Sequence, residues 1–426
     1  MPSIPPSSQP PSPANGSVHA SAHAEPVRDR MTRGELRASL SLASIFALRM
    51  LGLFLILPVF AEFARTLPDG HDAQRVGIAM GIYGLMQAFL HIPLGWLSDR
   101  IGRKPVMVGG LLLFVAGALV AAFSDTLTGI TVGRAMQGMG AISAAITACI
   151  ADLTRERHRT KAMAMVGGSI GLTFALSLVI ASPLLHGIGM SGIFGLMAVL
   201  GLVAIGVTIF LVPTPPPPHP VQLPFRSVLL NPDLIRMNVG VLALHSSQVA
   251  MFMVVPAMLR DAGMPLDQHW KVYLPVVLVS FVLMLAPMMA AERHGKVRPV
   301  LLASVALMTA VQLLFATVHG LWPIVVVLLL FFVAFNVLEA MQPSLVSRYA
   351  ASSRGAALGV YNTTQSLGLA LGGVAGGWLL KHEGRPAVFV GCAVVLMLWL
   401  IIAWSMKAPP ARASGEKSGG TSAVAA

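Results

Sequence analysis

Charged residues are scarce in this sequence. Only 11% of its 426 residues are Asp, Glu, Lys or Arg, whereas 55% are hydrophobic. A water-soluble protein of this size needs more polar residues to cover its surface, so the composition excludes a soluble globular fold. The segments of about ten residues with alternating hydrophobicity that are typical of a membrane β-barrel are also missing. Cysteine is rare, and because Cys149 and Cys392 lie in different apolar stretches, no structural disulfide is expected.

The sequence contains long apolar stretches instead. A helix needs roughly 20 mostly apolar residues to cross a bilayer. Twelve such stretches occur, which predicts an all-α polytopic membrane protein with twelve transmembrane helices. The expected spans are 40–62, 76–97, 106–123, 128–151, 162–185, 193–212, 237–259, 272–291, 300–318, 321–346, 356–380 and 387–406.

A proline-rich stretch divides these spans into two sets of six. It reads VPTPPPPHPVQLPFRS, at residues 212–227, and a run of prolines holds the chain extended and non-helical. The two halves also resemble each other. The charged turn DRIGR at 99–103 is matched by ERHGK at 292–296, in the same place between a second and a third helix, and KAMAMVGGSIGLTFAL at 161–176 is matched more weakly by AALGVYNTTQSLGLAL at 356–371.

These repeats predict two pseudo-symmetric six-helix bundles with a binding site between them, near the middle of the membrane. We expect an N-terminal bundle at 39–212, a linker at 213–235 and a C-terminal bundle at 236–406. The Pro- and Ser-rich segment 1–38 and the segment 407–426 are expected to be disordered tails.

The basic residues predict the orientation. Most of the 29 Lys and Arg residues lie in the two tails and in the loops expected on the same side as the tails. Because cytoplasmic loops are rich in Lys and Arg, both termini are expected in the cytoplasm, at the inner membrane of the cell. The net charge of +12 does not indicate nucleic acid as a partner, because the basic residues occupy short loops and form no aromatic-interleaved patch.

Three stretches identify the sequence as a member of a known family. GWLSDRIGRKPVMV, at 95–108, resembles the signature between helices two and three of the major facilitator superfamily. GRAMQGMGAI, at 133–142, resembles the arginine-bearing fourth-helix motif of its proton-coupled members, and LGLFLILPVF, at 51–60, resembles the first helix of its drug–proton antiporter branch. The resemblance covers about residues 33–407. It implies the major facilitator fold and alternating access driven by protons.

One stretch departs from the antiporter pattern. Antiporters of the superfamily typically carry a Gly-Pro motif in the fifth helix, but this sequence reads GGSIGLTFALSLVIASP at 167–183, with Ser182 before Pro183. Proton-coupled uptake by symport therefore stays open beside export by antiport.

The charged loop of the family signature is expected to act as a conformational latch. Asp99, at a helix end, is expected to face the positive N-terminus of the eleventh helix near Gly355. Arg103 is expected to pair with Asp152 only when the two halves close inward, and Gly95 lets the second helix pack closely. The alternative is that the basic residues of this loop only enforce topology.

Four ionisable residues inside the spans are candidates for proton coupling. Glu339 is the leading one, because it is the only carboxylate more than a turn or two inside an expected span. His245 is the second, because imidazole titrates near physiological pH. Arg49 and Arg134 are costly in a membrane and are not expected to face lipid. The alternatives are a locked Glu339–Arg49 pair and a histidine that only hydrogen-bonds between helices.

Further polar residues inside the spans are expected to line a substrate cavity. They are Tyr83, Gln87, His91, Asn336, Tyr361, Asn362 and Gln365. The sequence shows no metal-ligand cluster, no catalytic nucleophile pair and no phosphate-binding loop, so no metal, no cofactor and no enzymatic activity are expected.

The leading functional prediction is a monomeric transporter in membrane lipid that exports a small amphipathic molecule in exchange for protons. The alternatives are a proton-coupled uptake symporter and a non-transporting membrane sensor.

Overall fold

The structure, a computed structural model, describes residues 31–215, 225–350 and 353–406, and all regular secondary structure in these residues is helical. The helices of the N-terminal half are α1 (Arg33–Ile56), α2 (Phe60–Ala64), α3 (Ala73–Ile101), α4 (Arg103–Ala122), α5 (Leu127–Met139), α6 (Ser143–Leu153), α7 (Glu156–Gly206) and the π-helical η1 (Val207–Leu211). The helices of the C-terminal half are α8 (Phe225–Leu229), α9 (Pro232–Asp261), the 3-10 turn η2 (Leu266–Gln268), α10 (Trp270–Leu283), α11 (Leu285–Arg293), α12 (Val297–Phe315), α13 (Leu321–Tyr349), α14 (Arg354–His382) and α15 (Arg385–Trp404).

The predicted all-α membrane fold is confirmed, and every expected span coincides with helix. Ten helical segments in the described part of the chain are long and apolar enough to cross a membrane. One of them, Lys161–Leu211, has 51 residues, which is enough for two crossings. The glycine-rich α14 coincides with the eleventh expected span.

Several expected spans differ in detail from single continuous helices, among them the first, which is interrupted between α1 and α2 at residues 57–59. The fifth and sixth spans meet at Gly189, where φ is 68°, a left-handed conformation that glycine adopts without strain. The fourth span is divided into α5 and α6 near Gly140, where a Cβ would lie only 2.3 Å from the Gly110 carbonyl oxygen. The eighth span is divided into α10 and α11 at Met284.

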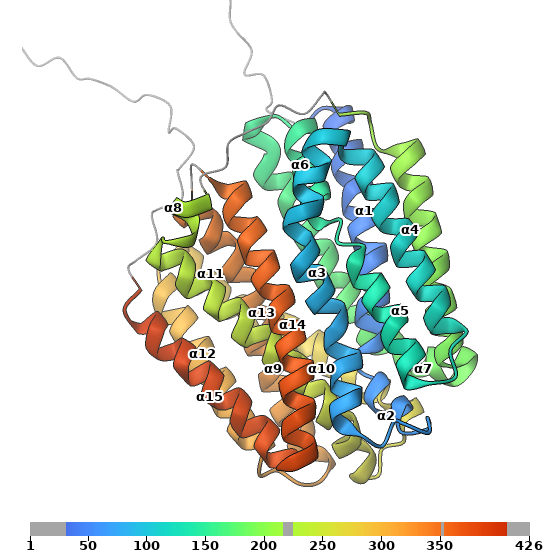
Figure 1. The fold of residues 1–426 in the computed structure, drawn as a ribbon. Helices are drawn as coiled ribbons and strands as arrows, with labels where there is room; N and C mark the ends of the chain where they lie inside the picture. The colour runs from blue at the N-terminus through green and yellow to red at the C-terminus, as the bar shows by residue number, and fades with distance from the viewer. Residues whose placement is uncertain (1–30, 216–224, 351–352, 407–426) are drawn as a thin grey trace, which may run out of the picture.

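The helices form two groups that lie side by side (Figure 1), one from α1 to α7 and one from α9 to α15. We call them the N bundle and the C bundle. The described chain enters α1 and leaves α15 at the same end of the molecule, where α8 also lies. We call this end the tail end and the opposite one the far end. The two bundles diverge toward the tail end in Figure 1.

Two expected segment boundaries are wrong. Residues 33–38, expected in a disordered tail, form the start of α1, because Thr32 and Glu35 make a reciprocal capping box. The expected linker 213–235 contains α8 and the first turn of α9, which begins at Pro232 with the Asn231 side chain as its cap. The rest of the expected linker at 216–224 and both tails, at 1–30 and 407–426, lie outside the described residues.

The bundles approach most closely where α3 packs on α14. A Cβ on Gly77 would lie 2.2 Å from the Gly373 carbonyl oxygen, and a Cβ on Gly81 would lie 2.7 Å from that of Ala370. Only residues without a bulky side chain allow two helix backbones to come this close. These glycines lie in the far-end half of both helices, so they bring the far ends of the two bundles into direct contact.

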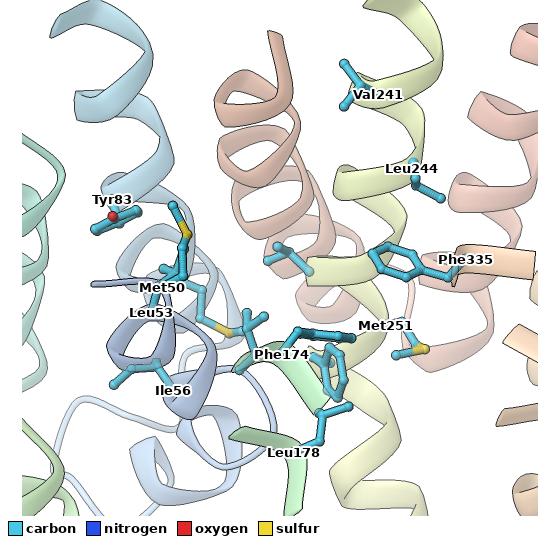
Figure 2. Packing of buried hydrophobic residues seen from close by; sticks show 14 of the residues in the cluster. Met50, Leu53, Ile56, Tyr83, Phe174, Leu178, Val241, Leu244, Met251 and Phe335 are labelled. Atoms are coloured by element: carbon cyan, nitrogen blue, oxygen red, sulfur yellow. The ribbon is translucent and has the colours of Figure 1, made fainter. Parts of the chain in front are cut away.

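Aromatic side chains fill the interface between the bundles beside this contact. The Phe174 ring on α7 lies 5.7 Å from the Phe335 ring and 6.0 Å from the Phe332 ring, both on α13. Figure 2 shows Phe174 between side chains of the N bundle, such as Leu53, and side chains of the C bundle. The core is therefore continuous across the two halves.

Candidate functional site

Three predicted site residues meet in the C bundle. Glu339 on α13 and Gln365 on α14 both approach Nε2 of His245 on α9, Glu339 with Oε2 at 3.6 Å and Gln365 with Nε2 at 2.7 Å. The other ring nitrogen, Nδ1 of His245, lies 3.1 Å from the Val241 carbonyl oxygen. This separation is too long for a hydrogen bond, but a small movement of either side chain brings the carboxylate and the imidazole within hydrogen-bond distance.

This cluster is only partly shielded. The His245 side chain is 6% exposed and that of Glu339 is 29% exposed. Oε2 of Glu339 has no hydrogen-bond partner among the described residues. The hydroxyl of the buried Tyr361 on α14 also lacks such a partner within the described ranges, and Tyr361 interacts electrostatically with Glu339. Glu339 is therefore a membrane carboxylate that is neither locked in an arginine pair nor sealed from solvent.

Arg49 occupies a different place from the expected one. The Gln87 side-chain amide is oriented so that both of its polar atoms are satisfied. The Gln87 oxygen accepts from Nη2 of Arg49 at 2.8 Å, and the Gln87 nitrogen donates to Oγ of Ser366 at 3.2 Å. Arg49 also donates to Oγ of Ser143 at 3.2 Å. The alternative in which Arg49 pairs with Glu339 is therefore wrong for this conformation. Gln87, on α3, links Arg49 of the N bundle to Ser366 of the C bundle.

Arg134 holds two N-bundle helices together. Its Nε donates to the Ala79 carbonyl at 2.6 Å and its Nη2 donates to the Met80 carbonyl at 3.1 Å, both on α3. The Tyr83 ring centre lies 5.9 Å from the guanidinium carbons of both Arg134 and Arg49. Arg134 is 1% exposed, so its charge is stabilised by the backbone carbonyl dipoles and by the face of the Tyr83 ring.

The remaining predicted cavity residues are dispersed. His91 is 5% exposed, and neither of its ring nitrogens has a hydrogen-bond partner in the described chain. Asn336 donates to Oγ of Ser280 at 3.0 Å and so joins α13 to α10. Asn362 is half-buried, and its carbonyl accepts from Oγ of Ser366 at 3.0 Å. None of these three side chains hydrogen-bonds to Glu339 or His245 in the described residues, although Asn336 and Asn362 lie one helical turn from Glu339 and Gln365.

The latch residues lie together at the tail end. Arg103 donates from Nε to Asp152 at 2.9 Å, from Nη1 to Ser98 at 2.8 Å, and also to Asp99. Ser98 donates in turn to the Gly95 carbonyl at 2.7 Å. Arg103 thus joins α4 to the end of α3 and to the end of α6. These contacts are internal to the N bundle, so the expectation that the Arg103–Asp152 pair exists only when the two halves close is wrong, and Asp99 contacts Arg103 and not the start of α14 in this conformation.

Two ion pairs across the far end were not predicted from the sequence. Lys381 at the end of α14 binds Asp72 at 2.8 Å, and Arg260 at the end of α9 binds Glu62 on α2. In both pairs, one residue comes from each bundle. Asp72 also caps α3 by accepting from the backbone of Gln74. The hydrogen bond from Lys381 lowers the pKa of Asp72.

Comparisons with known proteins agree with this architecture. The profile of the Major Facilitator Superfamily matches residues 42–291 and 241–425. The inner membrane transport protein YajR of Escherichia coli is 43% identical over 389 residues, 89% of this chain and 86% of that protein. The multidrug resistance protein MdtH of Aeromonas hydrophila is 27% identical over 341 residues, 77% of this chain and 82% of that protein.

A solved structure shows the same fold. The human organic anion transporter MFSD10 superimposes with a TM-score of 0.64 at 17% sequence identity, covering 87% of this chain and all of that chain. At this identity, the likeness concerns the fold alone. The family profile and the 43% identical relative establish the relationship independently of the fold: this chain belongs to the major facilitator superfamily of membrane transporters.

Proposed function

We propose that this protein is a proton-coupled secondary transporter that exports a small amphipathic molecule by antiport. The observation that carries the proposal is Glu339, a carboxylate deep in a span, 3.6 Å from His245 and 29% exposed. A charged carboxylate in a membrane is costly unless it is paired, protonated or hydrated. Glu339 has access to a proton acceptor and to solvent, so its charge can change during a transport cycle.

The arrangement of the bundles supports alternating access. The α3–α14 contact and the ion pairs Asp72–Lys381 and Glu62–Arg260 hold the far end closed. The bundles diverge at the tail end (Figure 1). We assign the tail end to the cytoplasm from its Lys and Arg content, so the conformation described here is the inward-facing one.

We also propose that the Arg103 cluster acts in the opposite, outward-facing state. In the present conformation, Asp99 binds Arg103. Closure of the tail end brings the end of α3 toward the start of α14, whose N-terminal dipole attracts a carboxylate. The contact of Asp99 with Arg103 then weakens, and Asp99 instead interacts with the N-terminus of α14. Asp152 stays hydrogen-bonded to Arg103 and holds it in place.

The class of substrate is proposed from two observations. The interface between the bundles carries aromatic and methionine side chains, among them Phe174, Phe335 and Met50 (Figure 2), which suit a ligand with a broad apolar surface. One relative is named a multidrug resistance protein, and one protein of the same fold is named an organic anion transporter. One chain supplies both bundles and the Glu339 cluster, so the functional unit is a monomer surrounded by lipid.

Proton movement in proteoliposomes tests the proposed function. Purified protein is reconstituted with a pH-sensitive dye inside, and a panel that includes ethidium, tetracycline and organic anions is added outside. Antiport predicts that each transported compound entering the vesicle drives protons out, so the lumen becomes more alkaline. Acidification on entry of the compound instead identifies a symporter. Movement of a compound without any proton flux contradicts proton coupling.

A topology measurement tests the orientation. We expect a reporter fused after residue 218 to lie in the cytoplasm and one fused at Asp69 to lie outside, because basic loops are retained on the cytoplasmic side. Alkaline phosphatase and green fluorescent protein fusions at the same two positions give opposite signals for the two sides. A cytoplasmic signal at Asp69 contradicts the twelve-span topology.

Asp72→Asn is expected to favour opening of the far end slightly. Asparagine still caps α3 but loses the ion pair with Lys381, and an exposed pair of this kind changes an equilibrium by at most about fivefold. Spin labels at Asp125→Cys and His319→Cys, two exposed far-end loop positions in different bundles, measure the opening. We call these the far-end labels. The control is Asp69→Asn, which removes only an exposed pair with Arg75 inside the N bundle.

The Asp72 effect has a defined pH dependence. Lys381 lowers the pKa of Asp72 in the closed state, so the pair favours closure above the ordinary carboxylate range and this contribution is lost as the pH falls below about 4. The variant and the parent protein should therefore open equally at low pH. A difference that persists there contradicts the role of the ion pair.

A further inference from the structure

The hydrogen bonds of His245 define where its proton resides. The Val241 carbonyl can only accept, so Nδ1 of His245, 3.1 Å away, carries a hydrogen. In the neutral ring, Nε2 is then an acceptor, and the Gln365 amide nitrogen donates to it at 2.7 Å. A ring that is also protonated at Nε2 has no lone pair left to accept the hydrogen bond from Gln365. The Gln365 amide must then turn its oxygen to the ring or withdraw.

The proton that causes this change has a source next to the ring. Oε2 of Glu339 on α13 lies 3.6 Å from the same Nε2. Transfer from the protonated Glu339 carboxyl to Nε2 leaves a carboxylate beside an imidazolium. Two further titratable groups lie on the neighbouring helices: Tyr361 on α14 interacts with Glu339, and Cys392 on α15 contacts Ser247, two residues along α9 from His245. Neither carries a positive charge that opposes protonation.

The next residue of α14 makes the polar contact with the other bundle. Ser366 accepts from the Gln87 amide of α3 at 3.2 Å, and Gln87 accepts from Arg49. Around Ser366, the backbone of α14 lies very close to the backbones of α3 and α9. A Cβ on Gly84 would lie 2.5 Å from the Ser366 carbonyl oxygen, and one on Gly368 would lie 2.7 Å from the Leu242 carbonyl oxygen of α9. α14 is thus packed tightly against both α9 and α3.

We propose that Gln365 is the positioning residue that couples protonation of His245 to the contact between the bundles. This coupling rests on the proposed function, because it assumes that the Glu339–His245 pair takes up and releases protons. A neutral His245 holds the Gln365 amide, and α14 then presents Ser366 to Gln87. A protonated His245 turns its Nε2 hydrogen to the Glu339 carboxylate, 3.6 Å away, and so releases the amide. The resulting movement of residues 365–366 weakens the Ser366–Gln87–Arg49 link and favours separation of α14 from α3.

Two substitutions separate the steps of this coupling. Gln365→Leu removes the amide that senses His245, whereas Gln87→Leu leaves that amide and removes the link between the bundles. Thr364→Val is the control, because the Thr364 hydroxyl donates only to the Val360 carbonyl of its own helix. All variants carry the far-end labels, and their distance distributions are measured between about pH 5.5 and pH 8, the range in which histidine titrates. The His245 ring is observed by ¹⁵N NMR and assigned with His245→Gln.

The unsubstituted protein and Thr364→Val should show the far end opening as the pH falls. Gln365→Leu should alter the Nε2 signal of His245 and reduce the pH-dependent change in the opening equilibrium by about fivefold, as expected for one hydrogen bond. Gln87→Leu should leave the Nε2 signal unchanged and reduce the opening response similarly. A full response in Gln365→Leu overturns the role of Gln365 while leaving proton coupling intact. Absence of any pH response in the unsubstituted protein overturns the proposed function as well.

Discussion

Gly77→Ala is expected to hold the far end open and to stop the transport cycle. The added methyl group would lie 2.2 Å from the Gly373 carbonyl oxygen and 2.9 Å from the Gly377 Cα atom. Both are backbone atoms, so no side chain can rotate away, and α3 must separate from α14. Overpacking of this kind costs about 1–3 kcal/mol, which shifts the equilibrium between closed and open far ends by about 5- to 150-fold. The far-end labels should report a longer distance.

Gly109→Ala is the matched control for this substitution. Gly109 lies on α4, and a Cβ there meets nothing within 4 Å. Because alanine is the better helix former, by about 0.5–1 kcal/mol, the control should be at least as stable as the parent protein. The same propensity gain operates in Gly77→Ala, so loss of closure there cannot come from a weaker helix. A closed far end in Gly77→Ala contradicts the proposed role of the α3–α14 contact.

The sequence predicted the helices well because membrane spans are determined locally. A run of about 20 apolar residues has few alternatives to a helix in lipid. The ends of the helices were predicted less well where a capping interaction, and not hydropathy, determines the first helical residue. The polar residues 33–38 extend α1 outside its apolar stretch, because Thr32 and Glu35 satisfy the first backbone donors. That capping box, a threonine followed three residues later by a glutamate, was present in the sequence as a signal.

The pairing of polar residues was harder to predict because it depends on helix rotation and bundle packing. Glu339 and His245 were both recognised as candidates, but their proximity follows from the placement of α13 beside α9. The small-residue contact could have been found, since Gly77 and Gly81, and likewise Gly373 and Gly377, follow the Gly-x-x-x-Gly spacing of close helix pairs. The far-end ion pairs carry no such pattern. They join helix ends of different bundles and become visible only in the folded chain.

Glu339→Gln is expected to uncouple transport from the proton gradient. Glutamine has the shape of the protonated glutamic acid but cannot release a proton, so the cycle loses its proton-dependent step. Accumulation of a transported compound driven by a pH difference should fall at least about tenfold, whereas exchange of that compound down its own gradient should continue. In the proteoliposomes described above, the dye measures proton movement, and the amount of compound retained in the vesicles measures both accumulation and exchange.

Ser347→Ala is the matched control, because Ser347 lies on the same helix as Glu339 and its hydroxyl donates to the Pro343 carbonyl of that helix. We expect it to retain proton-driven accumulation to within about threefold, the effect of losing one hydrogen bond between neutral groups. His245→Gln tests the partner of Glu339. Its amide cannot take up a proton either, yet Glu339 still can, so accumulation should fall less than in Glu339→Gln. If Glu339→Gln accumulates the compound as well as the parent protein does, Glu339 is not the coupling site, and a larger defect in His245→Gln then assigns the proton to the imidazole.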